Sequence, residues 1–513
     1  MLSSERVANS VLAPEEQRLQ AVLATHPEVT QAVLHAETGA DGRRVRTAYL
    51  LPKRIGAHPT DHGARTREYV EEWEAVYDYV YAGPEPADAT FDVRGWNSSF
   101  TGTEIAEGDM RDWVHHTVAR IQGLGREWIL ELGCGTGLLL HRLAPTARRY
   151  VGSDVSRAAV DRIAQSFGGT PPGNVELHHA PADEVGFIAP GSVDCAVINS
   201  VTQYFLDETY LTKVLRQAVA AVGTGGAVYV GDVRSAALNR AFCTGLELAT
   251  VDDSTPREQL QARVERRCCT GTELLIDPGY FTDLPAVIPR IAHVAILPKR
   301  SRRPSEMNRY RFDAVLSLDT PPAPLTTIPE WRSWTAADMD LAALRHILQD
   351  DEPDALGFSD VRNARTHADH TAAQLLQRFD GPSSAADIRA EAESGGAGVD
   401  PEELWDLAEK LPYTVELSSA RSAPDGSFDV AFLRDGPNPR TAEFPHHPTP
   451  PRQHTNQLWH ACAENLDPLQ LRRYVREQLP GIPTPDRIVV LEEFPLTPDG
   501  EVDRSALTTI HWA

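Results

Sequence analysis

Between positions 128 and 232, apolar residues fall into four short, nearly continuous runs, and each run closes in a turn. The runs are WILELGCGTG, RYVGSDVS, VDCAVINS and AVYVGDVRS, and residues 210–222 carry the apolar spacing of a helix. Strands that are apolar on both faces and alternate with helices are typical of a covered parallel sheet. We therefore predict a doubly wound α/β domain, in which ligands bind beyond the carboxyl ends of the strands.

Weaker patterns flank this domain. They predict a helix over 15–24, a β-hairpin formed by 29–35 and 45–51, mixed helix and strand over 329–436, a helix over 469–478 and a strand over 487–491. The sequence TGADGR supplies the turn of the hairpin. Polar stretches rich in His and Pro, at residues 55–67 and 445–454, predict two linkers.

Composition narrows the possible functions. Hydrophobic residues make up 41% and charged residues 24% of the 513 positions, and no apolar run approaches the roughly 18 residues that span a bilayer. The first residues carry no basic and apolar segments of a secretory signal. We therefore expect no membrane role and a cytoplasmic location.

Charge and cysteine content exclude two further kinds of partner. With 73 acidic and 49 basic residues, the formal charge is −24, which repels the phosphate backbone of nucleic acids. The six cysteines form no CxxC pair and have no histidine at zinc-ligand spacing. The sequence therefore predicts reduced thiols, no structural metal and no nucleic-acid partner.

A glycine loop follows the first predicted strand and opens a helix. Gly133, Gly135 and Gly137 leave room for a ligand near the backbone, and the helix amides can hold an anionic group. The dinucleotide fingerprint needs a further glycine where this chain has Leu138. The loop therefore argues against a dehydrogenase.

Two acidic residues follow the next strands. Asp154 lies 21 residues after Gly133 (154 − 133 = 21) and is placed to accept hydrogen bonds from a ribose diol. Ala182 and Asp183 lie where a third strand ends, so the Asp183 carboxylate is expected to bond an adenine amino group; the alternative is a helix N-cap. Together the elements predict an adenosine-containing cofactor.

The motifs LELGCGTG and YVGSDVS resemble class I S-adenosylmethionine-dependent methyltransferases, which have a Rossmann-like fold. The resemblance is closer to the N-methyltransferase domains embedded in nonribosomal peptide synthetases. It rests on GWNSSFTGTEI (95–105), VINSVTQYF (197–205), YVGDVRS (229–235) and EMNRYRFDAVL (306–316), and it covers about residues 77–434. Four motifs in the same order make the resemblance specific.

The resemblance implies S-adenosylmethionine as cofactor, with S-adenosylhomocysteine as product. The expected cofactor residues are Glu131, Gly133, Cys134, Gly135, Gly137, Asp154, Val155, Ala182, Asp183, Asn199, Ser200, Tyr204, Tyr81, Trp96, Ser98 and Thr101. Core packing is the alternative role for Trp96 and for the pair Tyr77 and Tyr81, which lie four residues apart on one helical face.

Candidate catalytic residues lie in two of these motifs. Asn199 closes a predicted strand where a methyl acceptor would lie, although capping is its alternative role. Glu306, Arg309 and Tyr310 precede a β-like run that lies over the acceptor in the family. Glu306 is the first choice for a general base or an amine anchor, and a solvated surface glutamate is the alternative.

The flanking segments THPEVTQAVLH with VRTAYLLP, and residues 471–507, resemble the small C-terminal subdomain of an adenylation domain. The family's last motif carries a lysine where LTPDGEVDR has Glu501, and a carboxylate there repels the nucleotide phosphate. Adenylation activity is therefore expected to be lost, and the flanks serve as a scaffold or as a docking surface. The predicted domains are an adenylation subdomain in two parts, a methyltransferase core with its cap and a C-terminal extension, with the boundaries 10–56, 68–330, 331–444 and 455–513.

The leading hypothesis is N-methylation of an aminoacyl or peptidyl group that a carrier protein presents in trans. A second hypothesis is methylation of N, O or C on a free small-molecule amino acid or peptide. A third is a non-catalytic scaffold of a synthetase, against which the three retained glycines and Asp154 argue.

Overall fold

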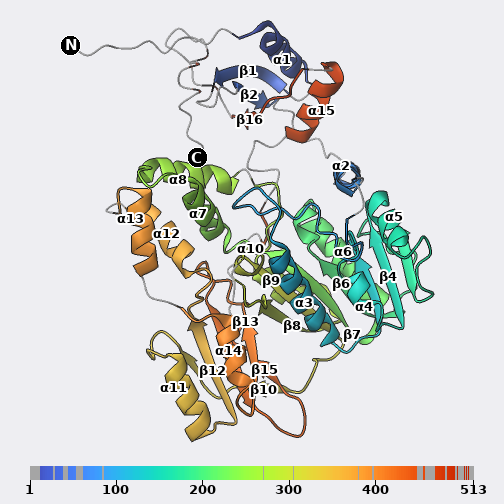
Figure 1. Cartoon of the computed structure of the whole chain (residues 1–513), viewed down its shortest axis with the longest axis vertical. Coiled ribbons are helices and arrows are strands. Elements are labelled where there is room, and N and C mark those ends of the chain that lie inside the picture. Colours follow the sequence, from blue (N-terminus) through green and yellow to red (C-terminus); the bar gives the residue numbers. More distant parts are fainter. Residues whose placement is uncertain are drawn as a thin grey trace. The chain divides into compact units, whose positions relative to one another are not determined.

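The structure is a computed structural model that describes residues 12–26, 29–38, 44–52, 62–81, 83, 86–269, 271–303, 305–378, 381–394, 398–446, 454–456, 468–479, 482–491, 494, 502, 504 and 507. The chain forms two compact units (Figure 1). The larger unit spans Gly63–Asn456, and the smaller one combines Met1–His62 with Gln457–Ala513.

The larger unit is built on a seven-stranded sheet with the strand order β5-β4-β3-β6-β7-β9-β8. The strands are β3 (Trp128–Leu132), β4 (Arg149–Asp154), β5 (Val175–His179), β6 (Val193–Asn199), β7 (Val222–Arg234), β8 (Ile291–Pro298) and β9 (Arg311–Leu318). The first five run parallel as predicted, whereas β9 pairs antiparallel with both β7 and β8. The strand order reverses between β3 and β6, which is where such sheets bind ligands.

Helices on this sheet begin at capping residues that the sequence supplies. The Ser156 hydroxyl accepts the N–H of Ala159 at the start of α5 (Arg157–Ser166), and the Asp207 carboxylate accepts the N–H of Tyr210 at the start of α6 (Glu208–Ala221). Other helices near the sheet are α3 (Glu107–Gln122), α4 (Leu140–Leu143) and α9 (Pro278–Val287).

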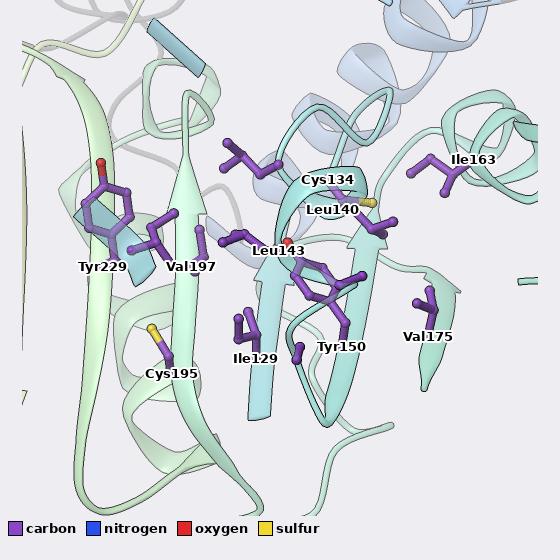
Figure 2. Close-up of a cluster of buried hydrophobic side chains, with 14 of the residues drawn as sticks. Ile129, Cys134, Leu140, Leu143, Tyr150, Ile163, Val175, Cys195, Val197 and Tyr229 are labelled. Carbon is purple, nitrogen blue, oxygen red and sulfur yellow. The ribbon is translucent and has the colours of Figure 1, made fainter. Parts of the chain in front are cut away.

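The core of the sheet is a cluster of apolar side chains from β3, β4, β6 and β7 (Figure 2). Tyr150, Cys195 and Tyr229 in it are fully buried. Each large apolar side chain buried in this way stabilises the fold by about 1.5–3 kcal/mol. The cluster makes the sheet a firm base for the loops at its carboxyl edge.

Two smaller layers complete the larger unit. A helical cluster consists of α7 (Asn239–Thr250), α8 (Arg257–Cys269), α12 (His367–Gln377) and α13 (Ala385–Ser394). A four-stranded sheet has the order β11 (Trp331–Ser333), β12 (Ala355–Val361), β14 (Phe428–Arg434) and β13 (Tyr413–Ser418), with α11 (Leu341–His346) and α14 (Pro401–Ala408) nearby in sequence. The short strands β10 (Leu325–Thr327) and β15 (Thr441–Glu443) pair with each other. Ser419 N donates to Ile296 O over 2.8 Å and so joins this part to β8.

The smaller unit joins segments from both ends of the chain. Strand β2 (Arg44–Pro52) pairs antiparallel with β1 (Val29–Thr38) and parallel with β16 (Arg487–Val490), so that Ile488 lies opposite Ala48. Leu19 of α1 (Pro14–Thr25) and Leu471 of α15 (Pro468–Gln478) are fully buried in one core with these strands. Glu501 and the rest of the TPDG turn lie outside the described residues.

The two predicted linkers lie largely outside the described residues, so they stay predictions. Within the first, residues 62–67 belong to the helix α2 (His62–Tyr81), in which Thr66 and Tyr69 are buried. At the end of the second, His454 O accepts the N–H of Asp277 over 2.7 Å, and the following Thr455 forms a β-bridge with Ile276. At least these ends of the two segments are therefore part of the larger unit.

Candidate active site

The glycine loop between β3 and α4 forms the floor of a cavity at the carboxyl edge of the sheet. Gly133, Gly135 and Gly137 have φ angles of 79°, 51° and 83°, a region that glycine enters without strain. A Cβ at Gly133 would lie 2.4 Å from a methyl group of Val201. At Gly135 the nearest atom would be the Tyr81 hydroxyl oxygen at 3.4 Å, so this position faces the cavity.

Asp154 lies on the cavity wall at the end of β4 and is 7% exposed. One carboxylate oxygen accepts the N–H of Gly135 over 2.7 Å, and the other accepts the N–H of Ser156 over 2.9 Å. Burial raises the pKa of Asp154, and these two hydrogen bonds oppose the rise. Each oxygen keeps a lone pair for a ligand hydroxyl.

Aromatic side chains form another wall. Trp73, Tyr77 and Tyr81 follow one face of α2, and Tyr204 of the 3-10 turn Thr202–Tyr204 meets them. The ring centroids are 5.8 Å apart for Trp73 and Tyr77, 5.4 Å for Tyr77 and Tyr81, and 4.6 Å for Trp73 and Tyr204. Burial raises the pKa of both Tyr77 and Tyr81, so their hydroxyls stay neutral. Such rings attract a cation such as a sulfonium.

A third wall comes from β6 and α3. Asn199 is 7% exposed, and its side-chain oxygen has no hydrogen-bond partner among the described residues. A Cβ at Gly231 would lie 2.2 Å from that oxygen, so the glycine keeps room for the amide. Trp96 and Trp113, with ring centroids 4.9 Å apart, line the cavity on this side. A buried carbonyl oxygen without a partner is costly and marks a place where a ligand can donate.

Most residues expected to contact the cofactor meet at this cavity. Those on its wall are Glu131, Gly133, Cys134, Gly135, Asp154, Val155, Ala182, Asn199, Ser200, Tyr204, Tyr81 and Trp96. The Glu131 carboxyl also accepts the Tyr150 hydroxyl over 2.7 Å, and burial raises its pKa to about 8.

Four expected cofactor residues lie off the wall. Each carboxylate oxygen of Asp183 accepts one bond from α6, one from the Tyr210 hydroxyl and one from the Lys213 ammonium, so the adenine contact stays a prediction; no described helix begins directly after Asp183, so the N-cap role is wrong. A Cβ at Gly137 would meet Ile163 at 3.1 Å, which gives Gly137 a packing role. Ser98 and Thr101 bond within their own turn, to the N–H of Phe100 and to the Thr103 hydroxyl respectively.

Three of the candidate catalytic residues also lie off the wall. Arg309 pairs with Asp369 of α12, and the Tyr310 hydroxyl donates to the same carboxylate over 2.7 Å. These bonds engage both side chains in holding α12, and their expected contact with the acceptor stays a prediction. Glu306 begins the short helix Glu306–Arg309, and its two oxygens accept the N–H of Ser99 over 3.1 and 2.9 Å. Burial raises the pKa of Glu306, and the charge of Arg311 opposes the rise.

Trp73 and Trp113 are among the wall residues that were not predicted from the sequence. Trp73 had a signal, because it lies four residues before Tyr77 and therefore on the same helical face. Trp113 had none, because it lies in an ordinary amphipathic helix and reaches the cavity only after α3 packs near the end of β7.

The residues present fit S-adenosylmethionine. The loop gives the methionyl tail close access to backbone amides, Asp154 offers acceptors for the ribose hydroxyls, and the aromatic wall suits the sulfonium. In the described part of the chain, no group of three or more His, Cys, Asp or Glu side chains could hold a metal ion. None of the helices in these same ranges is long and apolar enough to cross a membrane.

Comparison with known proteins agrees with this geometry. Residues 130–228 match the family described as a methyltransferase domain. The chain is 32% identical over 540 aligned positions to the chondramide synthase of Chondromyces crocatus, a match that covers 98% of this chain and 13% of that protein. It is 30% identical over 455 positions to a nonribosomal peptide synthetase of Emericella nidulans, covering 86% of this chain and 18% of that protein. The chain thus spans less than a fifth of either relative.

Among solved structures, the N-methyltransferase NodS of Bradyrhizobium japonicum, in complex with S-adenosylhomocysteine, matches with a TM-score of 0.31 and 14% identity. The match covers 48% of this chain and 98% of NodS. A likeness this distant carries no inference about the acceptor. The matched domain family, the sheet order and the glycine loop with its aspartate identify an S-adenosylmethionine-dependent methyltransferase domain in this chain, which over most of its length is similar to segments of nonribosomal peptide synthetases.

Proposed function

We propose that the chain transfers a methyl group to the amino nitrogen of an aminoacyl or peptidyl thioester, which a separate carrier protein presents. The similarity to the chondramide synthase extends over 98% of the chain and therefore includes both flanking pieces as well as the methyltransferase domain. This extent supports an acceptor made by a peptide synthetase. The flanks are, in this proposal, a remnant of an adenylation subdomain without adenylation activity.

One observation carries the choice of nitrogen: Asn199 lines the cavity, and its side-chain oxygen, buried beside Gly231, has no hydrogen-bond partner among the residues that the structure describes. A neutral amine keeps an N–H that can donate to this oxygen while its lone pair points at the methyl group. A deprotonated hydroxyl has no hydrogen left to donate. Asn199 therefore favours an amine acceptor over an alkoxide.

The residues around the cavity have complementary tasks in this proposal. The bound cofactor supplies a methyl group on a positively charged sulfur. Asp154 holds the ribose hydroxyls, and the rings of Tyr77 and Tyr81 surround the cofactor and exclude water. In-line transfer depends chiefly on such alignment and on water exclusion.

Glu306 is proposed to take the proton from the acceptor's ammonium group. Burial raises the pKa of Glu306, which brings it closer to that of an α-amine, near 8 in model compounds. The N–H of Ser99 holds its carboxylate. A base whose pKa approaches that of the group it deprotonates is the more effective one.

Mass spectrometry with methyl-labelled cofactor tests the proposal. The wild-type chain is offered aminoacyl carrier proteins, aminoacyl pantetheine thioesters and the matching free amino acids. We expect the label on nitrogen and faster turnover of the thioesters. Label on oxygen or carbon would overturn the choice of nitrogen, and faster turnover of the free amino acids would overturn the carrier-bound acceptor.

A further inference from the structure

Two neighbouring strands of the sheet break their extended conformation at the same edge. Ser200, directly after β6, has a φ of 57°, and Asp232, near the end of β7, has a φ of 63°. Residues other than glycine rarely adopt this region, and they keep it only where their surroundings hold them there. Asn199 lies opposite Gly231, and Ser200 N donates to Gly231 O over 3.1 Å, so the two irregular residues are adjacent.

The Asp232 carboxylate is fully buried and joins three elements. One oxygen accepts the Ser200 hydroxyl over 2.6 Å and pairs with Arg311 at the start of β9, and the other accepts the indole N–H of Trp113 on α3 over 3.1 Å. Ser200 and Trp113 both line the cavity, whereas Asp232 does not. Asp232 thus lies behind the wall and holds two of its side chains.

The same carboxylate bears on the charge around Glu306. Arg311 and Arg234 both act on Glu306 through their charges, while Glu273 pairs with Arg234 and the N–H of Ser99 binds Glu306 directly. Asp232 pairs with Arg311 through one oxygen, while Lys299 lies 3.7 Å from the other oxygen and Glu273 also acts on Arg311 through its charge. If the Asp232 charge is lost, the charge of Arg311 therefore stabilises the ionised form of Glu306 more strongly.

We propose that Asp232 is a positioning residue of the methyl-transfer reaction, which fixes Ser200 and Trp113 as the acceptor-side wall and balances the charge of Arg311. This inference rests on the proposed function of Glu306 as the base. It assigns Asp232 to the acceptor and not to the cofactor, because its bonds lead to β6, α3 and β9 and none leads to the glycine loop.

The test compares Asp232→Asn with Asp429→Asn. Asp429 on β14 is an equally buried aspartate, paired with Arg421, and it lies off the cavity wall. In Asp232→Asn we expect kcat to fall at least 30-fold while the cofactor Kd changes less than threefold. The acid limb of the profile of kcat against pH moves to lower pH, because the less balanced Arg311 lowers the pKa of Glu306. Asp429→Asn is expected to melt at a lower temperature, to leave the acid limb in place and to keep kcat within threefold.

Trp113→Phe covers the case in which Asp232→Asn does not fold. It keeps a ring in place and removes only the indole N–H, so we expect kcat to fall about tenfold at unchanged cofactor affinity. It also assigns the Trp113 indole resonance in nitrogen-15 spectra of tryptophan-labelled protein. That resonance is expected to shift in Asp232→Asn and to stay unchanged in Asp429→Asn, and this measurement needs no acceptor.

The outcomes separate this inference from the proposed function. If the wild type methylates a different acceptor, the proposed function fails, and the Asp232 comparison is made with the acceptor that it uses. An unmoved Trp113 resonance, an equal loss of kcat in Asp429→Asn, or a cofactor Kd that rises in step with the loss of kcat would each overturn the role of Asp232.

Discussion

The cofactor half and the acceptor half of the cavity are assembled differently. In the cofactor half, the loop 133–137 and Asp154 come from two consecutive strands, and the Gly135 N–H binds the Asp154 carboxylate directly. In the acceptor half, Trp113, Ser200 and Asp232 come from α3 and from the ends of β6 and β7, and they meet only through a buried carboxylate. The residues of the cofactor half thus come from one short segment of the chain, whereas those of the acceptor half come together only when the sheet folds.

This difference predicts that changes in the cofactor half act on cofactor affinity, whereas changes in the acceptor half act on turnover. The largest expected effect is that of Gly135→Val. A Cβ there enters the cavity, and the φ of 51° is strained for valine. We expect calorimetry to detect no binding of S-adenosylmethionine. Gly125→Val is the matched control, because Gly125 also has a positive φ, of 65°, but lies before β3 in open space. If Gly135→Val binds the cofactor with full affinity, the glycine loop is only a tight turn and does not contact the cofactor.

Glu306→Gln should have the next largest effect, and this effect should fall on turnover and not on cofactor affinity. We expect kcat to fall about 100-fold, as for loss of a general base, while the cofactor Kd stays the same. Because burial raises the pKa of Glu306, wild-type kcat should fall as the pH drops through a value above the ordinary glutamate range, and the variant should lack this limb. Glu107→Gln, at an exposed position on α3, is the control. An unchanged pH profile would remove Glu306 as the base.

Asp154→Ala tests the ribose contact. We expect the cofactor Kd to rise at least tenfold, or about 1.5–3 kcal/mol for a charged hydrogen-bond pair, with kcat at saturating cofactor much less affected. Asp161→Ala on α5 serves as the control, because this carboxylate is half exposed and pairs only with Arg157 in the same helix. If Asp154→Ala binds the cofactor normally and melts normally, Asp154 does not contact the ribose.

Asp183→Asn should have a smaller effect than Asp154→Ala, although both aspartates follow strands of the cofactor half. Its carboxylate is bound by Tyr210 and Lys213. We expect the cofactor Kd to change less than threefold, with a loss of about 1 kcal/mol of stability from the weakened hydrogen bonds. Equilibrium binding together with thermal melting checks both values. A tenfold rise in the cofactor Kd would indicate that Asp183 contacts the adenine.

Glu501→Lys should have the smallest effect of all. Neither the wild type nor this variant is expected to catalyse amino-acid-dependent pyrophosphate exchange, since one lysine does not create an ATP pocket. Methyl transfer should stay within about twofold, as for a change of surface charge worth at most about 0.5 kcal/mol. Detectable pyrophosphate exchange would reveal an adenylation site. A large loss of methyl transfer would indicate that the segment around Glu501 takes part in acceptor docking.

Particular residues show how far the sequence could be interpreted. Gly135 and Asp154 were predictable because their geometry depends on the strand and the turn that contain them. The bonds of Arg309 and Tyr310 to Asp369 could not be predicted, because Asp369 lies about 60 residues further along the chain and no local pattern indicates the pairing. Trp113 was missed for the same reason, since its bond to Asp232 spans 119 residues.

The parallel strands of the sheet and the glycine loop were predictable from the sequence, because hydrophobic periodicity and turn chemistry act over a few residues. The methyltransferase domain was predicted from the resemblance of its motifs, and the family match over residues 130–228 agrees. The polar groups at the cavity could be assigned only from the tertiary structure. Their roles depend on which buried donors and acceptors find partners when distant elements pack: Asp183 is bound by α6, whereas the Asn199 side-chain oxygen has no hydrogen-bond partner among the described residues. Burial makes each such pairing matter, because water cannot replace a missing partner inside the protein.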